Sequence, residues 1–201
     1  MALILFLTTH PVYAQQQATG IRHFDFVPQE SAIVFLAGST LHSFHGRAED
    51  AEGFAEGDVE QLGETAAGVL KVKVKGMATG NKARDESMME SLEEKKYPFI
   101  VFSAKGAAVS FVSEDKSKAR IELKGELNLH GVKKEIEIPA EITWADTRIS
   151  IKGKKELSLK DFRINPASFL FFKVKDKVVV EFDMVGKEKA FSRAGRSGRT
   201  G

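Results

Sequence analysis

The feature that most constrains the fold is a strict alternation of apolar and polar residues that recurs from residue 31 onward. In GVLKVKVKG, Leu70, Val72 and Val74 alternate with lysines. The same period of two returns in ARIELKGELNLHG, VKKEIEIPAEITW, RISIKGKKELSL and KVVVEFDMVG. Because successive side chains of a strand point to opposite faces, this period predicts strands with one buried face and one solvated face.

The number of such segments indicates a closed sheet. With SAIVFLAG, LHSFHGRAED and PFIVFSAKG, the alternating segments predict eight or nine strands, joined by short turns at 113–118 and 130–131. A single helix cannot cover an open sheet of that size, so the sheet must form a barrel or a sandwich. Long strands with hairpin connections favour an all-β, antiparallel eight-stranded barrel. Its interior holds packed side chains or one slender ligand, and the aliphatic inward residues require that ligand to be apolar.

One helix is predicted, from about residue 83 to about residue 95. Pro98 forbids its continuation and returns the chain to an extended conformation. Met88, Met89 and Leu92 form a narrow apolar stripe on an otherwise charged segment, which fits a short helix capping one end of the barrel. Two interpretations stay open: the stripe seals a packed barrel end, or it closes over a lipid tail, to which methionine adapts well.

Four ordered motifs carry a resemblance to a known family. The strings RDESMMESLEEKKYPFIVFSAK, GELNLHGVKKEIEIP and ELSLKDFRI resemble the YceI-like family over roughly residues 26–185. The resemblance implies a lipocalin-like barrel that binds a polyisoprenoid or similar amphipathic lipid in its lumen. It also implies export and no catalytic residues. The motifs fall on Arg84-Asp85, residues 97–102, residues 125–134 and Asp161-Phe162.

The chain departs from the family pattern in three places. Leu92 and two glutamates stand where the family carries a Phe-Phe pair, and Arg163 stands where a glycine usually follows the Asp-Phe motif. The segment after residue 39 contains His42 and His45 where plainer residues are common. The first two departures lie near the expected barrel mouth, so they bear on the identity of the lipid and not on the fold.

The ends of the chain predict its domain organisation. MALILFLTTHPVYAQQQ combines an apolar run with small residues at Val12 and Ala14, a signal-peptidase pattern, although an apolar N-terminal strand is the alternative. We expect a signal peptide over 1–14 cleaved near Ala14, a linker over 15–30, the barrel over 31–186 and a basic flexible tail over 187–201. This organisation predicts a periplasmic or secreted protein.

Composition narrows the function classes. The chain has no cysteine, which removes disulfides, thiol nucleophiles and an acylated lipoprotein anchor. Five of the 30 basic residues lie in the tail against one acidic residue, so the remainder of this chain of net charge +2 is slightly acidic. A nucleic-acid partner is therefore not expected, whereas the tail is suited to touch an anionic membrane surface.

The histidines provide little catalytic or metal-binding potential. His42 and His45 are three residues apart, which places them on opposite faces of a strand. His130 precedes Gly131 in a tight hairpin, where we expect its side chain to bond local backbone. No HExxH or GxSxG pattern occurs, so no catalytic residue and no metal are predicted. A hydrolase that uses His42 or His45 is the remaining enzymatic alternative.

The sequence thus predicts an exported protein that carries or sequesters a polyisoprenoid, such as a quinone or polyprenyl chain, or a fatty lipid, as a monomer or homodimer. The competing hypothesis is a structural or stress-related barrel that binds a protein partner and has a solid core and no ligand. The run 169–172 is interpreted either as packing under the barrel end or as an apolar lip for lipid entry, with Lys173, Lys175 and Lys177 near the headgroups. The candidate residues of lumen and lid are Phe35, Leu70, Val72, Met88, Leu92, Phe102, Leu123, Ile138, Trp144, Ile151, Phe171 and Phe182.

Overall fold

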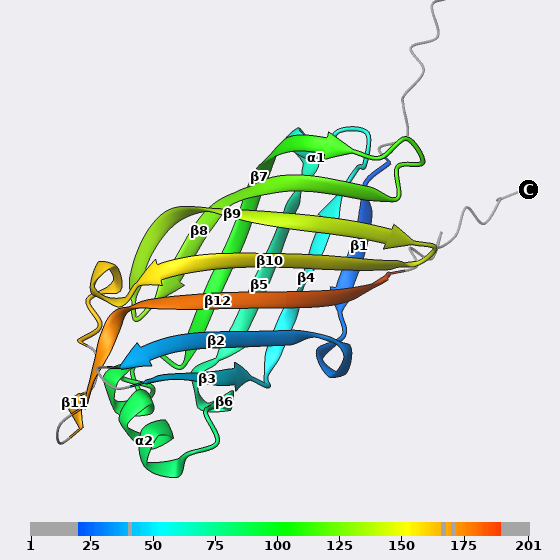
Figure 1. The fold of residues 1–201 in the computed structure, drawn as a ribbon. Coiled ribbons are helices and arrows are strands. Elements are labelled where there is room, and N and C mark those ends of the chain that lie inside the picture. Colours follow the sequence, from blue (N-terminus) through cyan, green and yellow to red (C-terminus); the bar gives the residue numbers. More distant parts are fainter. Residues whose placement is uncertain (1–19, 40–41, 166–167, 170–171, 190–201) are drawn as a thin grey trace, which may run out of the picture.

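The computed structural model describes residues 20–39, 42–165, 168–169 and 172–189, which form a closed antiparallel barrel (Figure 1). The eight barrel strands follow one another around the barrel, and β1 pairs with β12 to close it. The all-β, lipocalin-like architecture predicted from the alternation is confirmed. The strands are β1 (Arg22–Phe26), β4 (Ala51–Gly57), β5 (Ala67–Lys73), β7 (Phe99–Val112), β8 (Lys118–Leu129), β9 (Val132–Ala145), β10 (Arg148–Ser158) and β12 (Phe172–Glu188).

A second pair of strands widens one end of the barrel. β2 (Ala32–Ser39) continues β1 after a single 3-10 turn, η1 (Pro28–Glu30), and β3 (Ser43–Ala48) leads into β4. β12 is long enough to pair with β1 near its C-terminus and with β2 nearer its N-terminus. The two-residue strand β6 (Met77–Ala78) follows the 3-10 turn η2 (Val74–Gly76) and pairs with β3, while β11 (Ser168–Phe169) pairs with β12.

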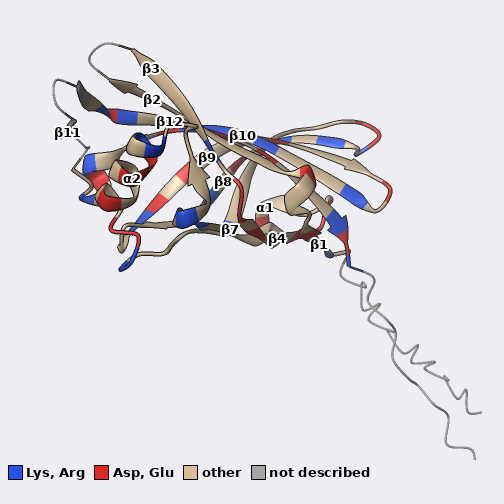
Figure 2. Cartoon of the chain, turned by 90° about the horizontal axis from the view of Figure 1, so that it is seen from below, with Lys and Arg blue, Asp and Glu red and all other residues tan. Residues whose placement is uncertain are grey.

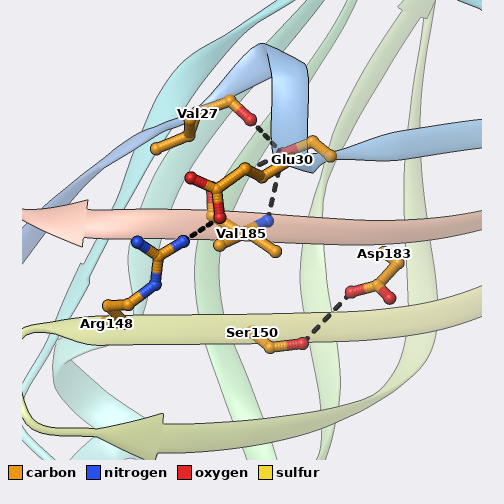
Figure 3. Close-up of polar contacts among 7 residues, drawn as sticks. Val27, Glu30, Arg148, Ser150, Asp183 and Val185 are labelled. Carbon is orange, nitrogen blue, oxygen red and sulfur yellow. Dashed lines mark hydrogen bonds and ion pairs between the residues drawn. The ribbon is translucent and has the colours of Figure 1, made fainter.

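One backbone hydrogen bond and the Ser31 side chain attach the turn between β1 and β2 to β12. The amide of Val27 donates to the carbonyl of Val185 at 2.8 Å. The hydroxyl of Ser31 accepts from the amide of Val185 at 3.0 Å and donates to the carbonyl of Val27 at 2.9 Å. Glu30 pairs with Arg148 of β10 across this turn (Figure 3). The barrel therefore stays closed although its first strand is interrupted.

This arrangement corrects two predicted boundaries. The barrel does not end at residue 186, because β12 continues through Lys187 and Glu188, the first two residues of the expected tail. The linker expected over 15–30 is wrong for its described part, because Arg22–Phe26 is a barrel strand that pairs with both β4 and β12. Its alternation was missed because the strand is only five residues long. The expected signal peptide and residues 190–201 of the expected tail lie outside the described residues. Among the described helices, none is long and apolar enough to cross a membrane.

One end of the barrel is packed solid. The short helix α1 (Leu62–Thr65) lies against β7 and β4 and brings Leu62 and Ala66 into a buried cluster with Phe24, Ile121 and Ile142. Alanines at inward positions of β7, β8 and β9 complete this cluster and let the strands approach closely. Burial of these apolar side chains stabilises the end that β1 closes.

The predicted helix forms at the opposite end. α2 (Lys82–Ser91) begins at Asn81, whose side chain accepts a hydrogen bond from the amide of Arg84 at 3.0 Å. It ends about one turn earlier than predicted, and Glu93 adopts a left-handed conformation with φ 48° just after it. α2 lies beside the ends of β2 and β3, over the widened end of the barrel (Figure 1).

Both acidic and basic residues occur on the outer wall and on α2 (Figure 2), and on the wall they form pairs between neighbouring strands. Lys71 pairs with Glu52 at 2.9 Å, so the lysine stripe of β5 faces acidic partners on β4. Lys152 and Lys154 of β10 pair in the same way with Asp183 and Glu181 of β12. Each exposed pair contributes little stability, but together they keep the outer wall polar.

Replacing Ser31 by alanine tests whether its hydroxyl holds the β1–β2 turn against β12. Ser31→Ala leaves the amide of Val185 without its acceptor, so we expect the free energy of unfolding to fall by about 1–3 kcal/mol. Ser150→Ala is the matched control, since its hydroxyl bonds Asp183 on the outer wall (Figure 3) and its loss costs under about 0.5 kcal/mol. Urea denaturation measures both variants. Equal losses would contradict a special role for Ser31.

Candidate functional site

A cavity of about 570 Å³ occupies the half of the barrel beneath α2. Its lining is mainly aliphatic side chains and phenylalanines from the inner faces of the strands and from α2. At the α2 end the lining includes the exposed residues His42, Asn81 and Ala83, so the cavity opens to solvent there. At its deep end it stops at Phe26, Phe54 and neighbouring residues, above the solid cluster that α1 covers. Its size lies within the range of roughly 300–1,000 Å³ that is usual for small-molecule sites.

Glycines at inward positions keep the cavity open. Gly46 pairs with Phe35, and Gly153 pairs with Phe182 on the neighbouring strand. A β-carbon on either glycine would lie 2.2 Å from the Phe35 ring or 2.4 Å from the Phe182 ring. The rings therefore lie along the wall, over the glycines, and the interior keeps free volume that larger side chains would fill.

Gly125 makes similar room below Phe102, whose ring lies 2.9 Å from the position that a β-carbon would take. A glycine inside a strand often marks a bulge or a bend. The register does shift there, because Lys105 of β7 is the extra residue between the pairs Ala104–Gly125 and Gly106–Lys124.

The structure brings together ten of the twelve candidate residues. Two are exceptions. Trp144 does not line the cavity, because it belongs to the α1 end of β9 and packs against the solid cluster. Phe171 lies outside the described residues, as do the side chains of the other residues of the predicted lip. The alternation of apolar and polar residues gave the correct, inward face for Trp144 but could not tell which half of the barrel is hollow. The ten that line the cavity are Phe35, Leu70, Val72, Met88, Leu92, Phe102, Leu123, Ile138, Ile151 and Phe182.

The polar part of the lining was missed. Seven polar residues line the cavity. Most of them belong to a helix or a turn, where the alternation of a strand does not show which side chains face inward. Lys155 is different: it shares the inward parity of Ile151 and Leu157, and that parity could have identified it. The seven are Ser39, His42, Asn81, Arg84, Ser87, Ser91 and Lys155.

The apolar stripe of α2 divides between the cavity and the core. Met88 and Leu92 line the cavity, whereas Met89 does not. All three pack against a buried cluster that includes Val74, Phe162 and other residues of the barrel end. The stripe thus holds α2 on the barrel while two of its members form the roof of the cavity. The interpretation of a fully packed end does not apply, since the space below the roof is open.

The histidines do not converge on one site. His42 lines the cavity, and its carbonyl accepts hydrogen bonds from the amide and hydroxyl of Ser39 at 2.8 and 2.7 Å. His45 is exposed on β3, on the opposite face from Phe44, which lines the cavity. Within the described ranges, no three His, Asp or Glu residues group in a way that could hold a metal ion.

Comparison with protein families decides the relationship. The sequence model of the YceI-like domain matches residues 24–186. The chain belongs to the YceI-like family. A search among curated proteins finds no match to the sequence.

Solved structures share the barrel of this YceI-like chain at low sequence identity. BcnA of Burkholderia cenocepacia is 14% identical, with a TM-score of 0.68 over 80% of this chain and 99% of its own. A polyisoprenoid binding domain from Saccharophagus degradans is 16% identical, with a TM-score of 0.66 over 85% and 99%. A Campylobacter jejuni YceI protein is 20% identical, with a TM-score of 0.58 over 72% and 85%. At these identities the likeness concerns the fold.

The family motifs of this YceI-like chain meet at the α2 end, where they hold the roof in place. Asp85 accepts hydrogen bonds from the amide and hydroxyl of Thr79 at 2.8 and 2.5 Å, which fixes the start of α2. The ring of Tyr97 lies 2.4 Å from where a β-carbon of Gly131 would be, so only glycine fits this turn. The ring nitrogen Nδ1 of His130 lies 3.1 Å from the carbonyl oxygen of Phe162.

The contact of His130 corrects the expectation of a local backbone bond. Its partner is 32 residues away, in the 3-10 turn η3 (Leu159–Phe162), so the histidine ties the β8–β9 hairpin to η3. The turn is also fixed by Asp176, which accepts from the Ser158 hydroxyl and the Lys160 amide; these hydrogen bonds lower the pKa of Asp176. Several long-range contacts therefore define the rim of the cavity.

The departure at Arg163 has a physical consequence. Arg163 ends η3 in the left-handed conformation with φ 57°, which is strained for any residue with a β-carbon. This explains why a glycine commonly follows the Asp-Phe motif in the family. In this chain the neighbouring bonds of η3 hold the conformation despite its cost.

The pairing of Phe182 with Gly153 can be tested by a double-mutant cycle. Gly153→Ala pushes the Phe182 ring from the wall, and we expect unfolding free energy to fall by about 1–3 kcal/mol. Phe182→Leu should remove much of this extra cost, because the shorter side chain does not reach the new methyl group. The coupling, measured by chemical denaturation of all four proteins, should therefore be clearly non-zero. Additive losses would contradict the proposed contact.

Proposed function

We propose that this protein binds a lipid with a long apolar tail, of the polyisoprenoid or fatty class, in the cavity beneath α2. It carries or sequesters the lipid and does not convert it. The observation that carries the proposal is the apolar cavity of about 570 Å³, which opens to solvent at the α2 end of the barrel. Membership in the YceI-like family and likeness to a polyisoprenoid binding domain support the same class of ligand.

The energetics of such a site follow from its lining. A tail enclosed by residues such as Leu70, Leu123 and Ile138 leaves water for an apolar surface, which contributes about 0.8 kcal/mol per buried CH₂. Within the paired stretches of the eight-strand ladder, the backbone groups bond one another and are satisfied without the tail. Affinity therefore arises from the tail, and a preformed cavity limits the ordering cost of binding.

The other two hypotheses find less support. A solid-core barrel that acts only through its surface does not account for the glycines that keep the interior open. A hydrolase that uses His42 or His45 lacks a convergent site, since one lines the cavity and the other lies on the outer face. Replacing both by Gln should abolish no enzymatic activity of the protein; loss of such an activity would favour the enzyme.

Export to the periplasm or beyond belongs to the same proposal. A lipid carrier outside the cytoplasm would move or hold a water-insoluble molecule between membranes, and the signal pattern that ends at Ala14 fits that role. Mass spectrometry of the mature protein from its host would give the cleavage site. An intact N-terminus in a cytoplasmic fraction would contradict export without affecting the proposed ligand.

Filling the cavity tests binding directly. Leu123→Trp adds an indole to the inner wall, so it should abolish co-purification of a lipid-mass ligand and weaken lipid binding at least about tenfold. Native mass spectrometry and titration of the stripped protein with a polyprenol measure the two effects.

Lys124→Trp is the matched control, because its side chain is on the outer face one residue away and is 54% exposed. Circular dichroism should show that both variants fold. A wild-type protein that never carries or takes up lipid, or a Leu123→Trp variant that binds as well as the control, would contradict the proposal.

A further inference from the structure

The cavity has a polar end and an apolar end. All seven polar lining residues belong to the half near α2, as the strand register makes clear. Ser39 and His42 lie at the turn between β2 and β3, and four others lie at the start of α2 or on it. The deep half, around Phe54, Ile151 and Met184, has an apolar lining. An amphipathic ligand would therefore enter tail first and leave its head beneath α2.

The charges of this lining have one sign. Arg84 and Lys155 line the cavity, and no aspartate or glutamate of the described residues does. The guanidinium of Arg84 lies 4.3 Å from the centre of the Phe44 ring, on the wall of the cavity. This stacking on an aromatic face orients a planar group whose N–H donors match a carboxylate or a phosphate.

Lys155 is the exceptional lysine of its strand. Lys152 and Lys154 point outward and pair with acidic residues of β12 at 2.9 and 2.6 Å. Lys155 points inward with Leu157 and forms no ion pair with any described residue. It lies just beyond Gly153, the last residue of β10 that pairs with β9, where the two strands part.

The carboxylates nearest to this opening already have other partners. The cleft between β9 and β10 is lined by four acidic residues and by Lys155 itself. Each of the four pairs with a different lysine, at 2.6–3.8 Å, so none supplies a counterion to Lys155. The pairs are Glu135–Lys105, Glu137–Lys124, Glu156–Lys177 and Asp161–Lys134.

Arg84 and Lys155 reach the same end of the cavity. Lys155 pairs with Val180, Val180 pairs with Phe35, and Phe35 pairs with Gly46, two residues from Phe44. Both side chains are half-buried, and a cation that has lost part of its water gains most from an anion bound beside it. Ser87 and Ser91 add hydroxyl groups on the face of α2 that turns to the cavity.

We propose that the ligand's head is an anion, a carboxylate or a phosphate, and that Arg84 and Lys155 bind it beneath α2. This inference rests on the proposed function, since it names the head of the lipid whose tail fills the cavity. Arg84 binds the head through its paired N–H donors, and Lys155 adds charge from β10. A neutral lipid of the same tail binds the same cavity without this contribution.

The test compares lipids that share a tail and differ in the head. The stripped full-length protein is titrated with palmitate and hexadecanol, and separately with farnesyl phosphate and farnesol. We expect the anion of at least one pair to bind about tenfold or more tightly than its alcohol. Preference within the first pair identifies a carboxylate, and preference within the second pair alone identifies a phosphate.

Variants connect this preference to the two side chains. Arg84→Gln and Lys155→Gln should each reduce the anion-to-alcohol ratio several-fold, and together they should bring it near one, while the affinity for the alcohol stays unchanged. Lys82→Gln on α2 and Lys154→Gln on β10 are the controls, because they remove the same charge from the outer surface. Their ratios should equal that of the wild type.

The outcomes separate the two proposals. Equal affinity for anion and alcohol in the wild type, with both bound, overturns the anionic head and leaves the lipid cavity standing. A preference that Lys154→Gln reduces as much as Lys155→Gln also overturns it, because the effect would then be net charge. Failure to bind any of the four compounds contradicts the proposed function itself.

Discussion

The whole barrel depends on how β12 pairs with both halves of the interrupted first strand. β12 pairs with β10 along one edge, and along its other edge it pairs with β2 and then with β1. The ladder would open between Phe26 and Ala32 without substitutes, and Ser31 and Val27 supply them through hydrogen bonds to Val185. β1 and β2 run in different directions from the turn. The barrel is therefore narrow at the end that β1 closes and wide at the end that contains β2.

That difference in width separates a packed half from a hollow half. The narrow half is filled by alanines, isoleucines and Phe24, with α1 over its end. In the wide half, glycines lie under the rings of Phe35 and Phe182, so a wall forms without filling the interior. α2 then spans an opening that the strands cannot close, and its own polar face supplies the hydroxyl groups of Ser87 and Ser91 there. The solid cluster beneath α1 and the cavity beneath α2 thus belong to different halves of one barrel.

Much of this architecture could be predicted from the sequence, because period two determines which face of each strand turns inward. It placed residues such as Leu123 and Ile138 on the inner wall without any knowledge of the pairing. It could not show that Trp144 lies in the packed half, because the alternation gives no position along the barrel axis. That position depends on the register of all eight strands. Nor could it predict that His130 binds Phe162 across 32 residues, a contact that depends on the tertiary fold.

The polar end of the cavity was the hardest part to foresee. Arg84 belongs to a helix whose orientation depends on Asn81, Asp85 and the rim of the barrel, and no local pattern predicts that it faces inward. Lys155 carries the right parity, but one lysine in a strand rich in lysines does not attract notice. The family motifs mark structural contacts at the rim through residues such as Asp85 and His130, and the first of them also contains Arg84, which lines the cavity.

The most direct measurement is the position of a bound lipid along the barrel. Two fatty acids, one with a nitroxide near the carboxylate and one with it near the methyl end, are bound in turn to the isotope-labelled protein. Paramagnetic broadening of the amide signals then locates each label. We expect the head label to broaden the signals of Ser87 and Ser91 and the tail label to broaden those of Leu123 and Ile151. The reverse order, or broadening confined to outer loops, would contradict it.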